Sequence, residues 1–302
     1  MADMARKKST TVRLKSQVRL MRSSFAALER VAPAVGARWA ERLWFTVPPG
    51  SRRQPIPEDG APFEVRLRGR AVRGWSWGGP GPVVYLVHGW GGQAGQLAPL
   101  VRPLVAAGFT VVAHDAPSHG ASDPGRRGPR SGDIIEFAQS VDAVAALHGP
   151  AYAVVGHSMG ALASVMAIRH GWLGADRLVM IAPMVNVLDV VPVFAGRLGL
   201  GPRIQRRLVR RIERAVDTPL GAFDIAALAA DEGWPPLLAI HDRDDAETPS
   251  LTTEALVAGW PDAKLVITRG LGHRRILRDP EVVRTVTDSL VAHADRVLAQ
   301  PA

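Results

Sequence analysis

The sequence predicts an α/β fold in which a mostly parallel sheet carries helices on both faces. Short strand-like runs recur along the chain, and segments with helical periodicity separate them from the third run onward. Two runs form a hairpin, and repeated strand-helix units follow, an order that builds a parallel sheet. We therefore expect eight strands, at residues 63–67, 71–77, 83–88, 110–115, 151–156, 177–181, 236–241 and 264–269.

Helices are expected between and after these strands, at residues 95–107, 133–147, 161–170, 251–259 and 280–299. Residues 184–224 follow the sixth strand and are long enough for two or three extra helices instead of one crossover. Residues 11–44 are also helical in pattern, with Pro33 ending or kinking a first helix before a second reaches Trp44. Apolar residues in the first helix recur at spacings of three and four and form a seam of Leu14, Val18, Met21, Phe25 and Leu28.

These elements divide the chain into two parts. Residues 1–62 are a basic amphipathic arm followed by a linker rich in proline: Pro48, Pro49, Pro55, Pro57 and Pro62. Residues 63–302 form the α/β domain, and residues 184–224 are inserted into it as a helical cap.

Composition excludes several classes of protein. The chain of 302 residues is 47% hydrophobic and 22% charged and has no cysteine, so disulfides, zinc-thiolate sites and thiol catalysis are excluded. No apolar run approaches the roughly 18 residues of a membrane span. The basic residues near the N-terminus precede polar residues, not the apolar core of a signal peptide, so we expect a cytoplasmic protein.

The net charge of +9 is confined to two helical segments. Residues 1–30 contribute +6 and residues 183–225 contribute +3, so the rest of the chain is neutral. No nucleic-acid-binding motif accompanies this charge, and we expect no nucleic-acid partner.

The segment Gly156-His157-Ser158-Met159-Gly160 lies between a buried strand and a helix. This G-x-S-x-G pattern is typical of a sharp turn whose strained backbone presents the serine hydroxyl above the sheet. The flanking glycines leave room where a Cβ would crowd the strand and the helix. Ser158 is therefore the candidate nucleophile, and the alternative is a tight turn with an incidental serine.

A serine nucleophile needs a base and a group that orients the base. Three candidate acids, Asp242, Asp244 and Asp245, follow the seventh strand, and His273 follows the eighth. The order Ser, Asp, His is that of one known catalytic triad. The aspartates that do not serve as the acid are expected in turns or as helix caps.

An oxyanion hole is also required. The third strand runs into His88-Gly89-Trp90-Gly91-Gly92, a turn whose backbone N–H groups can converge on an anion. We expect the N–H groups of Trp90 and Met159 to be the two donors, against the alternative that the turn is merely flexible.

From residue 63 to about residue 299 the chain resembles an α/β-hydrolase-fold serine hydrolase of the esterase/lipase type. The resemblance rests on residues 88–92, 115–122, 156–160 and 272–273 together with the acid loop. It implies an eight-stranded sheet with one antiparallel strand and a cap after the sixth strand. The family pattern His-Gly-x-x-Asp-x-x-Val-Pro maps onto Asp245 as the acid. In a second family pattern, Asp-x-x-Gly-x-Gly-x-Ser, Ser118 replaces the first glycine.

The resemblance implies acyl transfer without a cofactor or metal, because relatives that open epoxides or carbon–halogen bonds carry Asp at the position of Ser158. We expect a carboxylesterase-like serine hydrolase that cleaves a small-molecule ester or thioester through an acyl-enzyme. An acyltransferase or perhydrolase on the same site, or a non-catalytic ligand-binding relative, remain the alternatives. The arginine stripe of residues 203–214 is expected to be a solvated helix face, with binding of an anionic substrate as the alternative.

The apolar seam of the N-terminal arm needs a cover. The chain's own body, a second copy in a homodimer, or an anionic membrane surface could supply it. Glu29 and the short length of the seam make the arm a weak membrane anchor, so we favour the chain's own body or a second copy as the cover.

Overall fold

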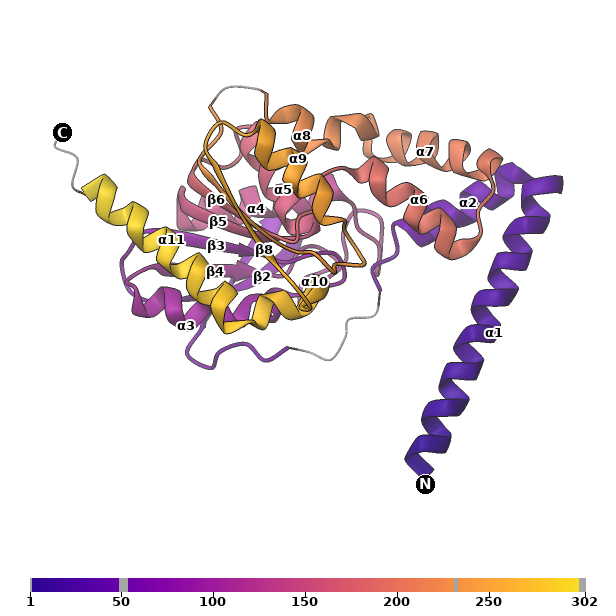
Figure 1. Ribbon diagram of the computed structural model, residues 1–302, viewed down its shortest axis with the longest axis horizontal. Helices are drawn as coiled ribbons and strands as arrows, with labels where there is room; N and C mark the ends of the chain where they lie inside the picture. Colours follow the sequence, from indigo (N-terminus) through magenta and orange to yellow (C-terminus); the bar gives the residue numbers. More distant parts are fainter. Residues whose placement is uncertain (1, 49–53, 231–232, 299–302) are drawn as a thin grey trace. The chain divides into compact units, whose positions relative to one another are not determined.

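The computed structural model describes residues 2–48, 54–230 and 233–298 (Figure 1). The chain forms two compact units. The α/β unit comprises Val47–Asn186 and Phe223–Ala302, and the helical unit comprises Met1–Thr46 and Val187–Ala222. Pro49 of the expected linker and the expected helix end at residue 299 lie outside the described residues.

All eight expected strands are confirmed, each with ends within two residues of the expected positions. They form one sheet in the order β1-β2-β4-β3-β5-β6-β7-β8. β2 is antiparallel to both of its neighbours, and the remaining pairs are parallel. The strand bounds are β1 Ala61–Leu67, β2 Arg70–Trp77, β3 Val83–Val87, β4 Thr110–His114, β5 Ala151–His157, β6 Ala175–Ile181, β7 Leu237–Asp242 and β8 Ala263–Thr268.

Helices cover the two faces of this sheet (Figure 1). Alternate strand residues, such as Val84 and Leu86 of β3, pack with α3 and α11 in one buried cluster. α4 and α5 pack together over the other face. The helices of this unit are α3 Ala98–Ala106, α4 Ile134–His148, α5 Met159–Arg169, α8 Ile225–Leu228, α9 Ser250–Gly259, α10 Gly272–Arg275 and α11 Pro280–Leu298.

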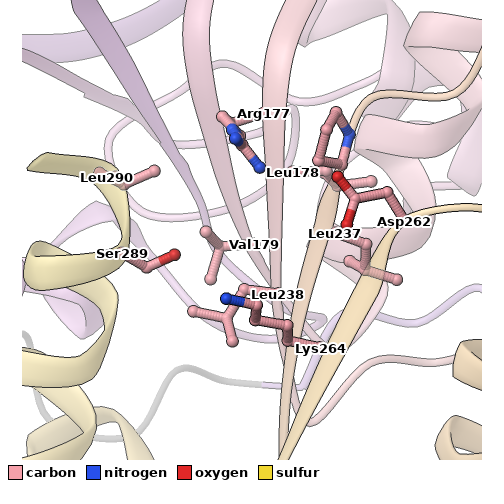
Figure 2. Close-up of a pocket in the computed structure, with 10 residues that line it drawn as sticks. Arg177, Leu178, Val179, Leu237, Leu238, Asp262, Lys264, Ser289 and Leu290 are labelled. Carbon is pink, nitrogen blue, oxygen red and sulfur yellow. The ribbon is translucent and has the colours of Figure 1, made fainter. Parts of the chain in front are cut away.

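The two ends of the parallel strands differ: one end has a small cavity, and the other carries the loops with the expected site residues. A cavity of about 80 Å³ lies beside the first halves of β6, β7 and β8 and next to α11, and Arg177, Asp262, Lys264 and Ser289 line it (Figure 2). Such a volume suits a few water molecules and is well below the ~300 Å³ of a small ligand pocket. The carboxyl ends of β3, β5, β7 and β8 carry the glycine-rich turn, Ser158, the acid loop and the histidine loop.

The helical unit consists of α1 Ala2–Val31, α2 Pro33–Trp44, α6 Val187–Leu198 and α7 Pro202–Val216. α1 begins nine residues earlier than its apolar pattern predicts. Pro33 occupies the first turn of α2, where its missing N–H costs nothing, so it begins the second helix of the arm. Two aromatic pairs join the helices: Phe25 stacks on Trp39 at 4.4 Å between ring centroids, and Trp44 meets the edge of Phe194 at 5.1 Å.

The helical unit buries one stripe of α7 and part of the α1 seam. Ile204, Leu208, Ile212 and Val216 of α7 recur every fourth residue and are all buried. Phe25 of the seam is fully buried, whereas Val18 is 44% exposed. The C-terminal half of the seam is therefore covered by helices of this chain. Within the ranges that the structure describes, no helix is long and apolar enough to cross a membrane.

Candidate active site

Ser158 lies in a strained turn between β5 and α5. Its backbone has φ 53° and ψ −119°, a region that costs about 1–3 kcal/mol for a residue with a side chain. Its hydroxyl makes no capping hydrogen bond to the helix that follows. The backbone instead holds the turn, since Ser158 N–H donates to Ile181 and the Ser158 carbonyl accepts from Ala161 and Met184.

The two glycines of the motif are required by close packing. A Cβ on Gly156 would lie 2.5 Å from the Cα of Ala161, and a Cβ on Gly160 would overlap the carbonyl oxygens of Val87 and His88. These approaches let the start of α5 sit directly against the end of β3. The sequence argument for the glycines is therefore supported by the packing.

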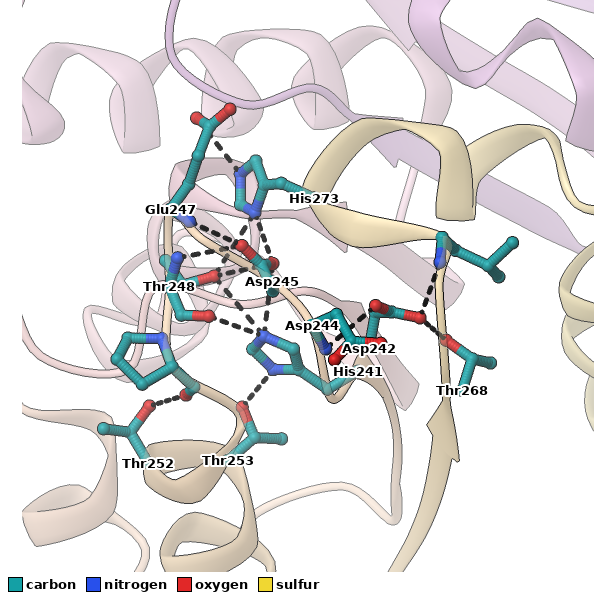
Figure 3. Close-up of polar contacts among 12 residues, drawn as sticks. His241, Asp242, Asp244, Asp245, Glu247, Thr248, Thr252, Thr253, Thr268 and His273 are labelled. Atoms are coloured by element: carbon teal, nitrogen blue, oxygen red, sulfur yellow. Dashed lines mark hydrogen bonds and ion pairs between the residues drawn. The ribbon is translucent and has the colours of Figure 1, made fainter.

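The acid loop and the histidine loop meet in the buried pair of Asp245 and His273. His273 Nδ1 lies 2.7 Å from Asp245 Oδ2, and the side chain of Asp245 is fully buried (Figure 3). Burial alone raises the pKa of Asp245, but hydrogen bonds from His241 and His273 and the charge of His273 outweigh it. The net effect holds the pKa of Asp245 below its usual value, so Asp245 stays ionised.

The other two candidate acids hold the backbone of the same loops. Asp242 accepts from the Thr268 hydroxyl at 2.7 Å and from Leu271 N–H at 3.0 Å. Asp244 accepts from Gly270 N–H at 2.9 Å. Both carboxylates thus fix the start of the histidine loop and leave the imidazole of His273 to Asp245.

Two residues beside Asp245 were not singled out from the sequence. His241 is fully buried, and its Nε2 lies 3.0 Å from the Thr248 carbonyl and 3.3 Å from Asp245 Oδ2, while its Nδ1 contacts the Thr253 hydroxyl. The Thr248 hydroxyl lies 3.2 Å from Asp245 Oδ2 and 3.3 Å from His273 Nδ1. The available signal was the family pattern itself, in which both residues fall within the acid motif.

His157 links the serine turn to the histidine loop. Its Nε2 lies 2.9 Å from the carbonyl oxygen of His273, and the two imidazole rings are 4.8 Å apart. Burial lowers the pKa of His157 to about 3, so the ring is neutral and Nε2–H donates this hydrogen bond. The residue next to Ser158 therefore positions the backbone of His273.

The glycine-rich turn lies against Ser158. A Cβ on Gly89 would lie 3.0 Å from the Cβ of Ser158. Among the described residues, no carbonyl or side chain accepts from the N–H of Trp90 or of Met159. Both expected oxyanion donors thus keep an N–H without an intramolecular acceptor, one just after Gly89 and the other just after Ser158.

Two buried histidines fasten this turn to the loop after β4. Ala116 N–H donates to His88 Nε2 at 3.0 Å, and Gly91 N–H donates to His119 Nε2 at 3.1 Å. Burial lowers the pKa of His88 to about 4 and that of His119 to about 3, which keeps both rings neutral and able to accept. The position of Trp90 therefore depends on two imidazoles in their neutral form.

The loop at residues 115–122 is locked by Asp115, which accepts from Ala94 N–H and Ala121 N–H at 2.7 Å each. Ser118, where the family pattern has glycine, takes a left-handed backbone with φ 66°. Its hydroxyl donates to the Ser131 carbonyl at 2.7 Å and accepts from Gly125 N–H at 2.9 Å. These two hydrogen bonds offset the strain that glycine would avoid.

The Nε2 side of His273 faces a further carboxylate. Glu247 Oε2 lies 3.9 Å from His273 Nε2 (Figure 3), and Glu247 also pairs with Arg274 at 3.3 Å. Glu247 is partly exposed, in contrast to Asp245. In the part of the chain that is described, no group of three His, Asp or Glu side chains is arranged to hold a metal ion.

Comparison with solved structures places the chain among α/β hydrolases. A membrane phospholipase A described as a bacterial virulence factor is 21% identical, with 95% of this chain and 99% of that chain covered and a TM-score of 0.58. A monoacylglycerol lipase from Paleococcus ferrophilus is 26% identical, with 72% and 97% covered and a TM-score of 0.54. A protein from Thermoplasma acidophilum described as a predicted CIB-like hydrolase is 17% identical, with 77% and 98% covered and a TM-score of 0.57.

The match to the membrane phospholipase A covers 95% of this chain. The unmatched residues are fewer than the 62 residues of the N-terminal arm, so part of the arm lies within the match. A family model adds sequence evidence to this likeness in fold. The model described as serine aminopeptidase, S33 (Hydrolase_4) matches residues 78–299. Since this match spans well over half of the chain, the chain belongs to the serine aminopeptidase S33 family and has the α/β-hydrolase fold.

Proposed function

We propose that this protein is a serine hydrolase that cleaves carboxylic esters or thioesters through an acyl-enzyme. The observation that carries the proposal is the strained Ser158 turn together with the buried Asp245–His273 pair. The turn follows β5, the pair comes from the ends of β7 and β8 of the same sheet, and His157, next to Ser158, hydrogen-bonds to the His273 carbonyl. Strain of this kind is retained where the geometry serves a function. The names of the similar structures agree, since they include a phospholipase A, a monoacylglycerol lipase and a thioesterase.

In the proposed reaction Ser158 Oγ attacks the ester carbonyl while His273 Nε2 takes the hydroxyl proton. His273 Nδ1–H donates to Asp245, which holds the ring in that tautomer and stabilises the imidazolium. The N–H groups of Trp90 and Met159 stabilise the oxyanion, each contributing a factor of about 10²–10³. His273 then protonates the leaving alcohol or thiol, and water releases the acid by the reverse sequence.

Labelling with a fluorophosphonate tests this proposal directly. We expect the wild-type protein to be labelled once, at Ser158, and to hydrolyse p-nitrophenyl esters. Ser158→Ala is expected to lose labelling and about 10⁴-fold or more of the turnover, because the nucleophile is absent. Ser164→Ala is the matched control, since Ser164 is buried in α5 and its hydroxyl donates to the Gly160 carbonyl of the same helix. Near wild-type turnover in Ser158→Ala would refute the mechanism.

Product analysis separates hydrolysis from transfer on the same acyl-enzyme. A panel of p-nitrophenyl esters of increasing chain length defines the acyl group, and competing alcohols or hydrogen peroxide define the acceptor. We expect the free acid as the main product. A new ester or a peracid as the main product would assign the chain to the transferases or perhydrolases instead.

A further inference from the structure

The positive charge of the chain is concentrated in the helical unit. Its residues include 17 Lys and Arg against 6 Asp and Glu, a net charge of +11. The α/β unit has 20 basic against 22 acidic residues, a net charge of −2. A separation of this size creates a positive potential around one unit only and attracts anionic partners to it.

The exposed side of α7 is made of arginine. At 100° per residue, the six arginines between residues 203 and 214 fall within an arc of about 140°. Arg211, at one edge of the arc, pairs with Glu41 of α2. The other five are exposed, and among the described residues none has a carboxylate within ion-pair distance: Arg203, Arg206, Arg207, Arg210 and Arg214.

A hollow continues this arc toward α2. It has a volume of about 390 Å³ and is lined by Arg38, Arg42, Arg211 and Glu41. Glu41 is already engaged with Arg211, so the hollow has an excess of guanidinium groups. We call the α7 arc together with Arg38 and Arg42 the arginine surface. Planar guanidinium groups bind phosphate oxygens through paired hydrogen bonds.

The same unit exposes apolar side chains. Of the eight large hydrophobic side chains exposed in the described residues, six belong to the helical unit: Val18, Leu20, Val31, Val35, Leu188 and Val193. Leu20 is 70% and Val31 is 80% exposed. Segments that bind at the surface of a membrane combine basic and apolar side chains. In this unit the two kinds lie on different helices, the arginines on α7 and the exposed apolar residues on α1, α2 and α6.

We propose that the helical unit is a docking surface for an anionic lipid membrane, with the arginine surface binding the lipid phosphates. This inference goes beyond the proposed hydrolase activity. The proposed membrane contact is separate from the cover of the α1 seam. Helices of this chain already bury Phe25 of the seam, whereas the α7 arginines and the six apolar residues are exposed. Binding would hold the attached α/β unit at the lipid surface.

Nucleic acid and acidic protein fit these observations less well. Single-stranded nucleic acid needs exposed aromatic rings for stacking, whereas Phe25, Trp39, Trp44 and Phe194 are paired with one another. An acidic protein would satisfy the arginines but would give no role to six separate apolar residues spread over α1, α2 and α6. A lipid surface offers partners of both kinds, since its phosphates bind guanidinium groups and its acyl boundary takes up apolar side chains.

Co-sedimentation of the full-length protein with vesicles tests the proposal without relying on catalysis. We expect binding to phosphatidylcholine vesicles that contain phosphatidylglycerol, weak binding to pure phosphatidylcholine, and loss of binding as salt rises. Arg206→Gln, Arg207→Gln and Arg210→Gln combined should weaken binding on the order of 100-fold, since each basic residue near such a surface contributes about 1 kcal/mol. The matched control combines Arg70→Gln, Arg169→Gln and Arg284→Gln, three exposed arginines of the α/β unit.

The outcomes separate the alternatives. Retention of vesicle binding by the control and its loss by the α7 variant would support the proposal. Equal loss in both variants, or no binding of wild type to anionic vesicles in low salt, would overturn it. Tighter binding to a DNA duplex or to polyglutamate than to vesicles of equal charge would also overturn it. Hydrolysis of a water-soluble ester by the same samples reports on the α/β unit separately, so failure of one proposal does not obscure the other.

Discussion

At the scale of single residues, Asp245 divides its two oxygens between different tasks. Oδ1 accepts the N–H groups of Glu247 and Thr248 at 2.7 and 3.1 Å and so fixes the loop. Oδ2 faces His273, His241 and the Thr248 hydroxyl. Because both oxygens are engaged, the carboxylate cannot rotate away from His273. The imidazole therefore meets an acceptor that is already oriented.

This arrangement predicts which aspartate matters most for turnover. Asp245→Asn should lower kcat about 10⁴-fold, because an amide removes the charge that stabilises the imidazolium and can stabilise the wrong tautomer. Asp244→Asn is the control and should cost less than tenfold, since an amide oxygen can still accept from Gly270 N–H. Steady-state kinetics on one soluble ester measures both. A larger loss in Asp244→Asn would contradict the assignment of Asp245.

At the scale of elements, α7 obtains its N-terminal cap from another helix. Residue Gly201 precedes α7 and supplies no side chain, and Glu29 of α1 accepts from Arg203 N–H at 2.8 Å and from Ile204 N–H at 3.0 Å. These are the N–H groups that a capping side chain normally binds, and the negative charge also opposes the positive end of the helix dipole. A Cβ at residue 201 would overlap the carboxyl group of Glu29.

The capping of α7 by Glu29 predicts that a substitution that usually stabilises a helix start is destabilising at residue 201. Gly201→Ser would normally favour a helix start, but here it should destabilise the helical unit by about 1 kcal/mol because it displaces Glu29. In a Glu29→Ala background the serine can cap α7, so the same change should be neutral or stabilising. Hydrogen exchange of the amides in residues 203–216 measures this cycle. Equal effects of Gly201→Ser in both backgrounds would show that Glu29 does not cap α7.

The sequence predicted secondary-structure elements better than it predicted which residues contact one another in the fold. The strands are short runs bounded by turn residues, and most of them are rich in apolar residues. The order of Ser158, Asp245 and His273 follows from where strands end. The amphipathic pattern of α1 predicted a helix with an apolar seam, but it did not identify the helices that pack against this seam. Contacts such as Glu29 with Arg203 join residues 174 apart, and no local pattern encodes them. His241 and Thr248 were missed although they lie in the acid motif, because the motif does not show that their side chains contact Asp245.

At the scale of the whole molecule, four buried histidines make the α/β unit sensitive to acid. Burial lowers the pKa of His88 to about 4 and of His114, His119 and His157 to about 3. Each is neutral in the folded protein, whereas in the unfolded chain a histidine takes up a proton below about pH 6.5. The stability that they contribute is therefore complete above pH 6.5 and is lost as the pH falls toward 4.

We expect this loss to be large enough to unfold the α/β unit at mildly acidic pH. At pH 5 each of the four histidines costs about 2 kcal/mol, against a typical total stability of about 5–15 kcal/mol. Urea unfolding at pH 7.5, 6 and 5 should show a steep fall, with about four protons taken up on unfolding at pH 5. His114→Gln should reduce that number by about one, since within the described ranges the His114 ring hydrogen-bonds to the Ser140 hydroxyl alone. Asp245 cannot account for this fall, because its lowered pKa affects stability only below about pH 4.

A free energy of unfolding that stays constant from pH 7 to pH 5 would contradict this prediction. It would mean that these imidazoles are protonated in the folded protein at pH 5, and that His88 and His119 cannot accept the N–H groups that hold the glycine-rich turn in place.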